Sequence, residues 1–444
     1  MTPRELANSI CDRLLRSGFQ AFLAGGCVRD LLLGREPADY DVATNATPDQ
    51  VMALFPESVA VGAQFGVILI PRNGHKVEVA TFRSDVGYSD GRRPDSVVFA
   101  NSAEEDVQRR DFTINGLLMR HDDGEILDFV GGRNDLHAGI VRAIGNADKR
   151  FEEDKLRLLR AVRFAARFAF EIEPETFRAI RKHAKSVSQV SPERIRDELT
   201  KMLTEGAAGN AFRLLDRTWL LQIVLPEIAA MQGVEQPPQF HPEGDVWVHT
   251  CMMLDGIPAG SAMTFAWGVL LHDVGKPPTF RSAAETGDRI RFDGHVEVGV
   301  RMGEEICRRL KMSNDETAQV LALIANHMKF KDAPHMRSST LKRFVRMPKF
   351  DEHMALHRLD CLSSHRHLDV YDFVRDFLDR TPPEQVRPSK LLTGDDLIRM
   401  GFSPGPEFKD ILQSIEDAQL EGTIATREEA VKLASSAFKS AGRK

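Results

Sequence analysis

The spacing of hydrophobic residues divides the chain into two parts that differ in their predicted secondary structure. In the first part, apolar residues alternate with polar ones over short runs, which is typical of half-buried strands. Between these runs, apolar residues recur every three or four positions, as in amphipathic helices. The predicted elements are a helix at 3–16, a strand at 20–24, a helix at 28–33, and two strands at 65–71 and 76–82 joined by the turn Asn73–Gly74.

From about residue 148 onward, the helical spacing continues almost without interruption. Apolar residues at three- and four-residue intervals predict one helix over Lys149–Phe168. Pro174 and the pair Ser191–Pro192 mark the expected starts of the next two helices, because proline is favoured in the first turn. The segment Val234–Gly244 is rich in turn residues and is the predicted boundary within the helical part.

The segment most informative about chemistry follows the first predicted strand. Gly25–Gly26 allows a sharp turn that brings the backbone close to a phosphate, and the next helix directs its N–H groups at that anion. Asp39 and Asp41 are two positions apart, so on a strand both carboxylates lie on one face, where they suit Mg²⁺. Taken alone, the same residues also fit a strand end followed by two solvated loop carboxylates.

Two later segments carry further candidate contacts to a nucleotide. Arg109–Asn115 is predicted to open or lie within a helix, which places Asp111 and Asn115 on one face. In the predicted helix that follows, Asp154 and Arg157 are three positions apart. A carboxylate beside a guanidinium can pair with the edge of cytosine or adenine, although an ordinary helical salt bridge has the same spacing.

Together, these segments resemble the motif series of the class II tRNA nucleotidyltransferases, which include CCA-adding, A-adding and CC-adding enzymes and bacterial poly(A) polymerases. In chain order the matching segments are Gly25–Asp30, Asp39–Asp41, Arg109–Asn115, Gly131–Leu136, Glu153–Arg157 and Ser191–Arg196. The resemblance implies an α+β fold, in which a small polymerase-β-like sheet domain precedes an all-α body.

The resemblance also implies a role for each matching residue. Asp39 and Asp41 are implied as catalytic carboxylates that hold Mg²⁺, and Glu78 is either a third carboxylate or a solvated strand residue. The implied nucleotide-binding residues are Gly25, Gly26, Arg29, Arg110, Asp111, Asn115, Glu153, Asp154, Arg157 and Arg160. Among these, the Glu153–Arg157 segment would select CTP or ATP without a nucleic-acid template. The implied RNA partner is tRNA, seated by its acceptor arm.

Two positions depart from the family pattern. Gly116 stands where alanine is usual, and Asp128–Phe129–Val130 lacks the usual Asp-Pro pair. Neither change removes a proposed ligand, so both are interpreted as packing variation. The turn-rich segment 83–108 resembles the family's flexible loop, and its length favours complete CCA addition over CC-only addition.

The second half of the chain contains a separate set of histidines and aspartates. The pair His272–Asp273 is accompanied by His249, His295, His327 and Asp360. Such residues suit one or two transition-metal ions when they converge from separate helices. The spacing resembles the HD superfamily of metal-dependent phosphohydrolases, as does the segment 241–249. This implies phosphatase or phosphodiesterase activity, but a metal site without hydrolytic activity would have the same sequence. His353, His357, His365 and His367 are assigned no role.

Composition narrows the remaining possibilities. The 444-residue chain has a formal net charge of −6, which argues against a non-specific basic RNA-binding groove. Basic residues nevertheless recur at Arg157, Arg160, Arg163 and Arg167, which fit either a phosphate track or a solvated helix face. The five cysteines form no Cys-x-x-Cys pair, and no membrane-spanning apolar stretch or secretory signal is evident. We therefore expect a cytoplasmic protein with no membrane partner.

The predicted domains are a nucleotidyltransferase head at 1–145, a helical nucleotide-selecting and RNA-binding neck and body at 146–233, an HD domain at 234–380 and a helical tail at 381–444. The predicted function is CCA addition to the tRNA 3′ end from CTP and ATP, with release of pyrophosphate and a further activity at the HD site. Alternatives within the class are an A-adding enzyme, a CC-adding enzyme and a poly(A) polymerase. Alternatives from other classes are an HD phosphohydrolase whose N-terminal half only binds RNA, and a pure RNA-binding scaffold.

Overall fold

The computed structural model describes residues 1–62, 66–86, 96–100 and 102–441, and these form two compact units. The first unit comprises Met1–Ala230, Ile257–Met263 and Ile306–Met312. The second comprises Met231–Gly256, Thr264–Glu305 and Ser313–Lys444. The predicted flexible loop at 83–108 lies partly outside the described residues.

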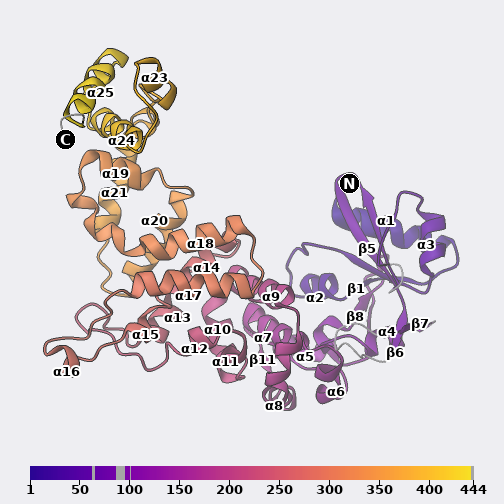
Figure 1. Ribbon diagram of the computed structural model, residues 1–444. Coiled ribbons are helices and arrows are strands. Elements are labelled where there is room, and N and C mark those ends of the chain that lie inside the picture. The colour runs from indigo at the N-terminus through magenta and orange to yellow at the C-terminus, as the bar shows by residue number, and fades with distance from the viewer. Residues whose placement is uncertain (63–65, 87–95, 101, 442–444) are drawn as a thin grey trace. The chain divides into compact units, whose positions relative to one another are not determined.

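A seven-stranded mixed sheet forms the base of the N-terminal unit, in the strand order β3-β4-β5-β2-β1-β8-β9. Its strands are β1 (Ala21–Ala24), β2 (Asp41–Thr44), β3 (Val59–Gly62), β4 (Val67–Arg72), β5 (His75–Thr81), β8 (Leu117–Met119) and β9 (Ile126–Asp128). The pair β2–β5 is parallel, and the other neighbours are antiparallel. Helices α1 (Pro3–Arg16), α2 (Gly26–Leu32) and α3 (Pro48–Leu54) pack on this sheet (Figure 1).

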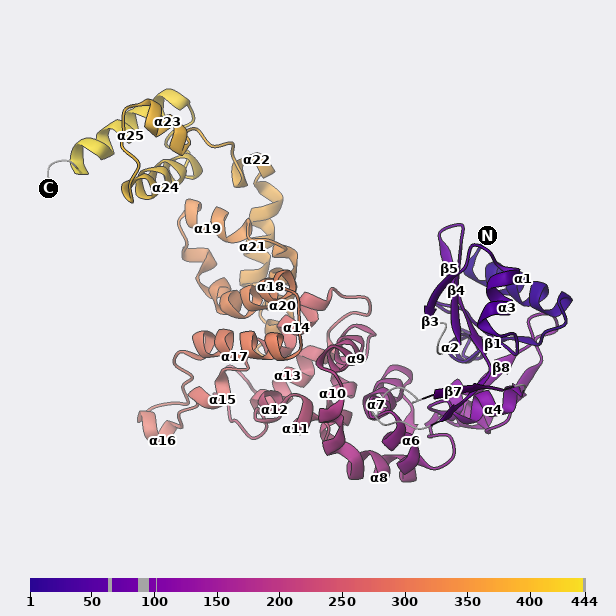
Figure 2. The ribbon, with the colours of Figure 1, turned by 45° about the vertical axis from the view of Figure 1, so that its right-hand side comes forward.

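The predicted hairpin between β4 and β5 is confirmed. The two strands pair in antiparallel register and protrude together from the sheet (Figure 2). Asn73 and Gly74 adopt positive φ angles of 52° and 77°, as a two-residue turn that follows the strand twist requires. The alternation buries Ile68 and Ile70 in the core below the hairpin.

The helix predicted around Arg109–Asn115 is wrong. Helix α4 (Ala103–Gln108) ends before this segment, and only the 3-10 turn η2 (Thr113–Asn115) follows. The Asp111 carboxylate accepts a hydrogen bond from the Phe112 N–H at 2.8 Å, and such local bonds compete with helix formation. Asp111 and Asn115 nevertheless meet, because the Asn115 Nδ2 donates to Asp111 Oδ1 at 3.0 Å.

The single helix predicted over Lys149–Phe168 is also wrong, because the chain forms two helices, α6 (Ala147–Glu153) and α7 (Arg157–Phe168). Asp154 ends α6 in an extended conformation, with φ −137° and ψ 105°. Its Oδ1 accepts from the Leu156 N–H at 3.1 Å and thereby fixes the break. Asp154 and Arg157 therefore do not lie on one helical face.

Short helices and strands complete the first unit. They include β6 (Arg83–Val86) paired with β7 (Ser96–Phe99), α5 (Gly132–Ala138), and β10 (Ile140–Val141) paired with β11 (Glu171–Ile172). The helical part contains α8 (Pro174–His183), η3 (Ala184–Gln189), α9 (Pro192–Thr204), α10 (Ala208–Arg217), α11 (Leu221–Val224) and α12 (Pro226–Ala229). The helix starts predicted at Pro174 and Pro192 are confirmed.

Among its described residues, the second unit consists of helices, connecting turns and an isolated bridge between Arg281 and Arg291. Its first elements are α13 (Val246–Asp255), α14 (Met263–Leu271), α15 (Lys276–Thr279), α16 (Ala283–Thr286), α17 (His295–Arg309), α18 (Asn314–Asn326) and η4 (His327–His335). They are followed by α19 (Ser338–Val345), α20 (Phe350–Ser363), α21 (Asp369–Arg380), α22 (Pro383–Val386), α23 (Gly394–Arg399), α24 (Glu407–Leu420) and α25 (Arg427–Ala441).

The predicted α+β class, a small sheet domain followed by helices, is confirmed. The last three helices gather around a core of their own that includes Leu397, Ile411 and Ile415 (Figure 2). Among the described helices, none combines the length and apolar character that crossing a bilayer requires.

Candidate functional site

A cavity of about 810 Å³ in the N-terminal unit brings together most of the residues predicted to bind a nucleotide. Its lining includes Gly25, Gly26, Arg29, Asp39, Asp41, Glu78, Arg110, Asp111, Asn115, Asp154, Arg157 and Arg160. Glu153, which was also predicted, stands outside this lining. The lining residues come from the β1–α2 turn, from β2 and β5, from the segment around η2 and from the α6–α7 junction.

The glycine turn is shaped by the close approach of an arginine. Gly25 has a φ of +69°, and a Cβ added there would lie 2.8 Å from the Arg110 Nη1. Asp106 holds Arg110 in place, with its Oδ2 accepting from Nη2 at 2.9 Å. Any side chain at position 25 would therefore meet both backbone strain and the guanidinium. The turn and Arg110 form one positively charged edge of the cavity.

The carboxylates of the cavity carry charge of the opposite sign. β2 begins at Asp41, and Asp39 lies in the bend before it, so the prediction that both share one strand face is wrong for Asp39. Asp41 is instead the register partner of Glu78 on the parallel strand β5. Burial, the Glu78 carboxylate and Asp39 raise the pKa of Asp41 to about 6, against the opposing effect of Arg110. Negative charge is thus crowded at this point.

Such crowding fits a cation with oxygen ligands. Mg²⁺ binds through one or two carboxylates together with substrate phosphates, so a complete cage of protein ligands is not needed. In the described part of the chain, Asp39, Asp41 and Glu78 do not bring three carboxylate oxygens within 4.8 Å of one another. They therefore do not form a complete ligand cage by themselves. The residues present therefore suit Mg²⁺ that arrives with a triphosphate.

Arg29 forms part of the cavity floor. Its side chain is 4% exposed and donates to Asp30 Oδ1 at 2.9 Å and to Asn115 Oδ1 at 2.5 Å. The guanidinium also lies over the Phe168 ring, 4.6 Å from its centroid. Burial lowers the pKa of Arg29, although Asp30 acts in the opposite direction. Arg29 is thus held by protein partners on several sides.

A partly buried ion pair joins the η2 segment to α7. The Arg160 Nη2 and Nε donate to Asp111 Oδ2 at 2.6 and 2.8 Å. Burial alone would raise the pKa of Asp111, but Arg160 and the Asn115 amide more than offset it and lower the pKa to about 2. Asp111 is therefore a permanent anion near neutral pH.

The two residues predicted to select the base are held by different partners. Arg157 donates to Glu153 Oε2 at 2.7 Å and to the Arg109 carbonyl at 3.0 Å. Asp154 accepts a bidentate pair from Arg194 at 2.9 and 3.2 Å. Sequence reasoning noted the segment containing Arg194 but gave it no role, because no local spacing connects positions 40 residues apart.

The glycine pair in the segment Gly131–Leu136 has a structural role. A Cβ added at Gly132 would lie 2.2 Å from the Thr113 carbonyl oxygen, so α5 packs directly on the η2 backbone. From the same helix, Asp135 Oδ2 accepts from the Thr113 hydroxyl at 2.7 Å. This motif therefore supports the turn that carries Asn115.

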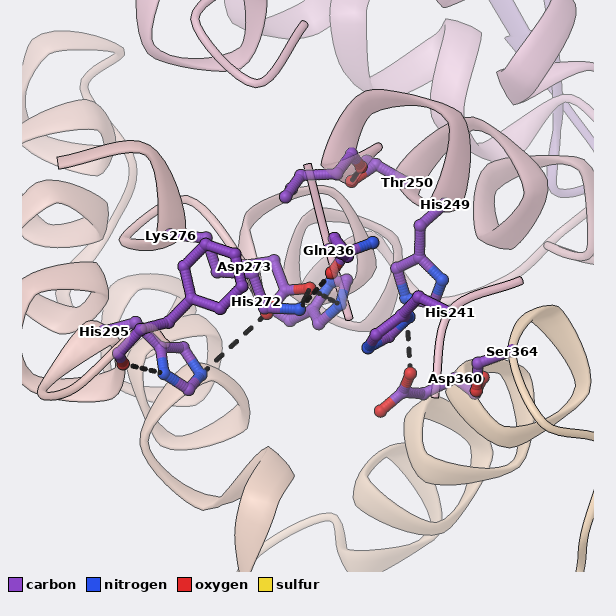
Figure 3. A network of polar contacts seen from close by, with 12 residues as sticks. Gln236, His241, His249, Thr250, His272, Asp273, Lys276, His295, Asp360 and Ser364 are labelled. Atoms are coloured by element: carbon purple, nitrogen blue, oxygen red, sulfur yellow. Dashed lines mark hydrogen bonds and ion pairs between the residues drawn. The ribbon is translucent and has the colours of Figure 1, made fainter. Parts of the chain in front are cut away.

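The second unit contains the histidine site, which we define as His249, His272, Asp273, His295, His327 and Asp360. All of these except His327 are labelled in Figure 3. The structure places the predicted residues in two groups of possible metal ligands. One group is His249, His272 and Asp360, and the other is Asp273, His295 and His327. Within each group, the ligand atoms lie within 4.8 Å of one another. Adjacent positions in the sequence, His272 and Asp273, thus contribute to different groups.

Three of these histidines are oriented in the same way. The Nδ1 atoms of His272, His295 and His327 lie 2.9, 2.9 and 2.7 Å from backbone carbonyls three residues earlier. A backbone bond at Nδ1 fixes the tautomer and leaves Nε2 directed at a ligand. Burial lowers the pKa of His327 to about 4, so this ring is neutral, as metal ligation requires.

His249 is oriented by a carboxylate rather than by the backbone. Its Nδ1 lies 2.7 Å from Glu243 Oε1, and its Nε2 lies 3.2 Å from Asp360 Oδ1. Burial lowers the pKa of His249, but Asp360 and Glu243 together raise it to about 9. A proton on His249 therefore neutralises these carboxylates, and a metal ion binding at Nε2 would displace it.

Sequence reasoning missed several residues around this site. Glu243 lies within the segment 241–249 but was assigned no role. Lys276 donates to Gln236 Oε1 at 2.6 Å, and its Nζ lies 2.7 Å from Asp273 Oδ2. The unassigned His357 stacks on Phe330 with centroids 4.3 Å apart, which makes it part of the core.

Comparison with known proteins gives separate matches to three successive parts of the chain. Residues 21–142 match the family model described as the poly A polymerase head domain, and residues 249–364 match the HD domain. Between them, residues 169–232 match the model described as the probable RNA and SrmB-binding site of polymerase A. The expected resemblance to the tRNA nucleotidyltransferase and poly(A) polymerase family is thereby confirmed.

Curated relatives include CCA-adding enzymes of Geobacillus stearothermophilus and Latilactobacillus sakei subsp. sakei (strain 23K). The first is 43% identical over 230 residues, which is 52% of this chain and 56% of the relative. The second is 41% identical over 255 residues, which is 56% of this chain and 64% of the relative. The chain thus spans a little over half the length of these relatives.

Solved structures match along the whole chain. The crystal structure of the Bacillus stearothermophilus CCA-adding enzyme in complex with CTP has a TM-score of 0.75 and 26% identity, with 100% of both chains covered. The Thermotoga maritima CCA-adding enzyme complexed with tRNA has a TM-score of 0.57 at 20% identity, covering 98% of this chain and 95% of that one, and shows the likeness of fold alone.

Proposed function

We propose that this protein is a tRNA nucleotidyltransferase that adds C, C and A to the 3′ end of tRNA from CTP and ATP. The observation that carries the proposal is the single cavity lined by Asp39, Asp41, the Gly25–Gly26 turn and the Asp154–Arg157 segment. CTP, ATP and tRNA are taken from the names and bound ligands of the similar proteins. Because tRNA maturation is intracellular, we place the protein in the cytoplasm.

In this proposal, each side of the cavity has a distinct task. Arg110, fixed by Asp106 beside the glycine turn, binds triphosphate oxygens through charge-assisted hydrogen bonds. Asp111, held as an anion by Arg160, accepts from a ribose hydroxyl. Arg29 supports this arrangement by its bond to Asn115.

Base selection falls to Asp154 and Arg157. The Asp154 carboxylate accepts from the exocyclic amine that cytosine and adenine share, and Arg157 donates to the neighbouring ring acceptor. Uracil presents a carbonyl where that amine is required, so it leaves Asp154 without a donor. Because Arg194 fixes the carboxylate, the pair is oriented before the nucleotide arrives.

Asp39 and Asp41, with Glu78 as a third carboxylate, would hold Mg²⁺. When bound, this ion lowers the pKa of the attacking hydroxyl and neutralises charge on the pyrophosphate. The protein residues supply the negative field that attracts the cation and align the tRNA 3′-hydroxyl with the α-phosphate. The helical body seats the acceptor arm by shape and backbone contacts.

The decisive experiment offers the full chain two tRNAs, one that lacks its last three nucleotides and one that ends in CC, with CTP, ATP or both, and sequences the products. We expect CC with CTP alone and CCA with both nucleotides. A product ending at CC with both nucleotides would identify a CC-adding enzyme, and addition only to tRNA ending in CC would identify an A-adding enzyme. Long A tails would identify a poly(A) polymerase. No extension of any RNA would contradict the proposal as a whole.

A second activity, phosphoester hydrolysis, is favoured by the two ligand groups of the histidine site. Three histidines direct their Nε2 atoms at the site, and the adjacent residues His272 and Asp273 belong to different ligand groups. This arrangement suits one or two transition-metal ions. The test measures hydrolysis of 2′,3′-cyclic and terminal phosphates with Mn²⁺, Ni²⁺ or Co²⁺. Absence of turnover in a metal-loaded protein would leave a metal site without this activity.

A further inference from the structure

An exposed tryptophan ends helix α10 in a conformation that usually favours glycine. Trp219 has a φ of +61° and is 53% exposed. The Leu220 N–H donates to the Leu215 carbonyl at 3.0 Å, and the Trp219 N–H donates to the Asp216 carbonyl at 2.9 Å. These are the bonds of a helix-ending turn whose left-handed residue is most often glycine. A bulky side chain at this position is strained, and strained residues are often found at binding sites.

One face of the indole ring is already occupied. The guanidinium carbon of Arg181, on α8, lies 3.6 Å from the ring centroid. A cation stacked on one side holds the ring in place and leaves the other side to a ligand. The Arg181 Nε is buried and has no hydrogen-bond partner among the described residues, so stacking accounts for its position. The exposed ring is therefore a rigid, flat platform.

The surroundings of this platform are positively charged. Arg178, Arg181, Lys182 and Lys185 follow one side of α8 and its extension, and Arg217 is exposed at the end of α10. Arg178 and Lys182 have acidic partners, Glu175 and Asp148. In the described part of the chain, Arg181, Lys185 and Arg217 have no acidic group within ion-pair distance. In a protein of net charge −6, these residues form a local concentration of positive charge.

We propose that Trp219 and Arg181 form a stacking platform for an unpaired nucleobase of the RNA substrate, with Lys185 and Arg217 beside its phosphates. Flat aromatic rings flanked by cations bind single-stranded RNA without regard to sequence, because every base offers a π face. Such a contact suits an enzyme that must accept tRNAs of many sequences. The inference rests on the proposed function, because it takes tRNA as the RNA.

The helix-ending geometry of Trp219 provides a clean test. Glycine is the residue that this backbone favours, so Trp219→Gly is expected to fold with an unchanged melting temperature while the platform is removed. Trp219→Leu keeps apolar bulk without a π face, and Trp219→Phe keeps a smaller one. The RNA is a tRNA lacking its last three nucleotides, and both its Kd and the steady-state constants for CTP addition are measured with the full chain.

We expect Trp219→Gly and Trp219→Leu to raise Kd and KM for the RNA about tenfold with kcat unchanged, and Trp219→Phe to recover most of the loss. Lys185→Met should reduce the dependence of log Kd on log salt by about 0.7. RNA affinity unchanged in Trp219→Gly and Trp219→Leu would overturn the inference, as a platform for a protein partner would give that result. If wild-type protein binds the RNA through Trp219 but adds no nucleotide, the platform stands and the proposed function fails.

Discussion

The cavity of the N-terminal unit and the histidine site of the second unit handle buried charge in opposite ways. At the first, Asp39, Asp41 and Glu78 line the same cavity, and both Asp39 and Glu78 raise the pKa of Asp41. At the second, each carboxylate lies beside a histidine or a lysine, as Asp273 does beside Lys276. The first site thus gathers like charges, whereas at the second each carboxylate has a neighbouring histidine or lysine to balance it.

The pKa values of Asp41 and Asp273 are shifted in opposite directions. Burial and like charges raise the pKa of Asp41 to about 6. Asp273 is more deeply buried, yet His272 and Lys276 hold its pKa well below the usual range. In the function proposed above, a cation at the first site would relieve repulsion, whereas a metal ion at the second would displace a proton from His249. Carboxylates of the same type can therefore suit either a metal ion that arrives with the substrate or one that stays bound, depending on their neighbours.

The first prediction removes the negative charge of the first site. Asp39→Asn with Asp41→Asn keeps shape but removes the charge that attracts Mg²⁺. We expect nucleotide addition to fall by at least about 10⁴-fold, because the metal-dependent stabilisation of the transition state is lost. The measurement is single-turnover CTP addition, with metal binding at the histidine site as the control. Addition within tenfold of wild type would contradict the assignment.

Part of both sites could be predicted from the sequence, and the failures have local physical causes. The period-two runs and Asn73–Gly74 predicted the hairpin because turn and strand signals agreed. The segment around Asp111 failed as a helix because its carboxylate bonds the next N–H, a competitor that periodicity does not reveal. Likewise, Asp154 breaks the predicted long helix by capping its own turn.

Long-range partners were beyond sequence reasoning. The histidine ligands could be picked out by residue type, but the bond from Glu243 that orients His249 requires the fold. Arg194 could not be connected to Asp154, because the sequence contains no spacing signal across 40 residues. Site residues were thus more predictable than the residues that position them.

The second prediction concerns how tightly the histidine site is built. A Cβ at Gly275 would lie 2.1 Å from the His295 backbone oxygen and 2.6 Å from the Gly299 N. Backbone atoms cannot move aside, so Gly275→Ala should destabilise the second unit by about 3 kcal/mol. Urea denaturation followed by tryptophan fluorescence measures this. A loss below 1 kcal/mol would show that the α15–α17 contact is looser than described.

The third prediction tests the metal ion proposed at the histidine site separately from the one proposed at the N-terminal cavity. His272→Ala with Asp273→Ala removes a ligand from each group of the histidine site. Wild-type protein should gain about 2.7 kcal/mol of stability when Mn²⁺ is present at 100 times its Kd, and the variant should gain none. Thermal denaturation with and without metal provides the measurement. Nucleotide addition is the control and should stay at the wild-type rate; its loss would mean that the two sites are coupled.

The fourth prediction tests whether Arg194 acts through Asp154. Arg194→Met leaves the carboxylate without its bidentate partner, so its orientation toward the base is no longer fixed. We expect the preference for CTP over UTP to fall about tenfold, since a well-placed pair is worth about 1–3 kcal/mol of discrimination. Arg194→Lys should restore part of the preference. Equal loss of CTP and UTP addition would indicate general damage instead of loss of selection.

The smallest expected effect concerns packing below the first site and contrasts with Gly275. A Cβ at Gly116 would lie 2.8 Å from Val130 Cγ2 and 3.1 Å from Ile144 Cδ1, and these are side-chain ends that can shift. Gly116→Ala should therefore cost only about 1 kcal/mol of unfolding free energy. Val130→Ala removes the methyl in the way, so the double variant should be more stable than the sum of the single changes by at least about 0.5 kcal/mol. Additive costs in urea denaturation would show that Val130 does not occupy the space of the alanine methyl.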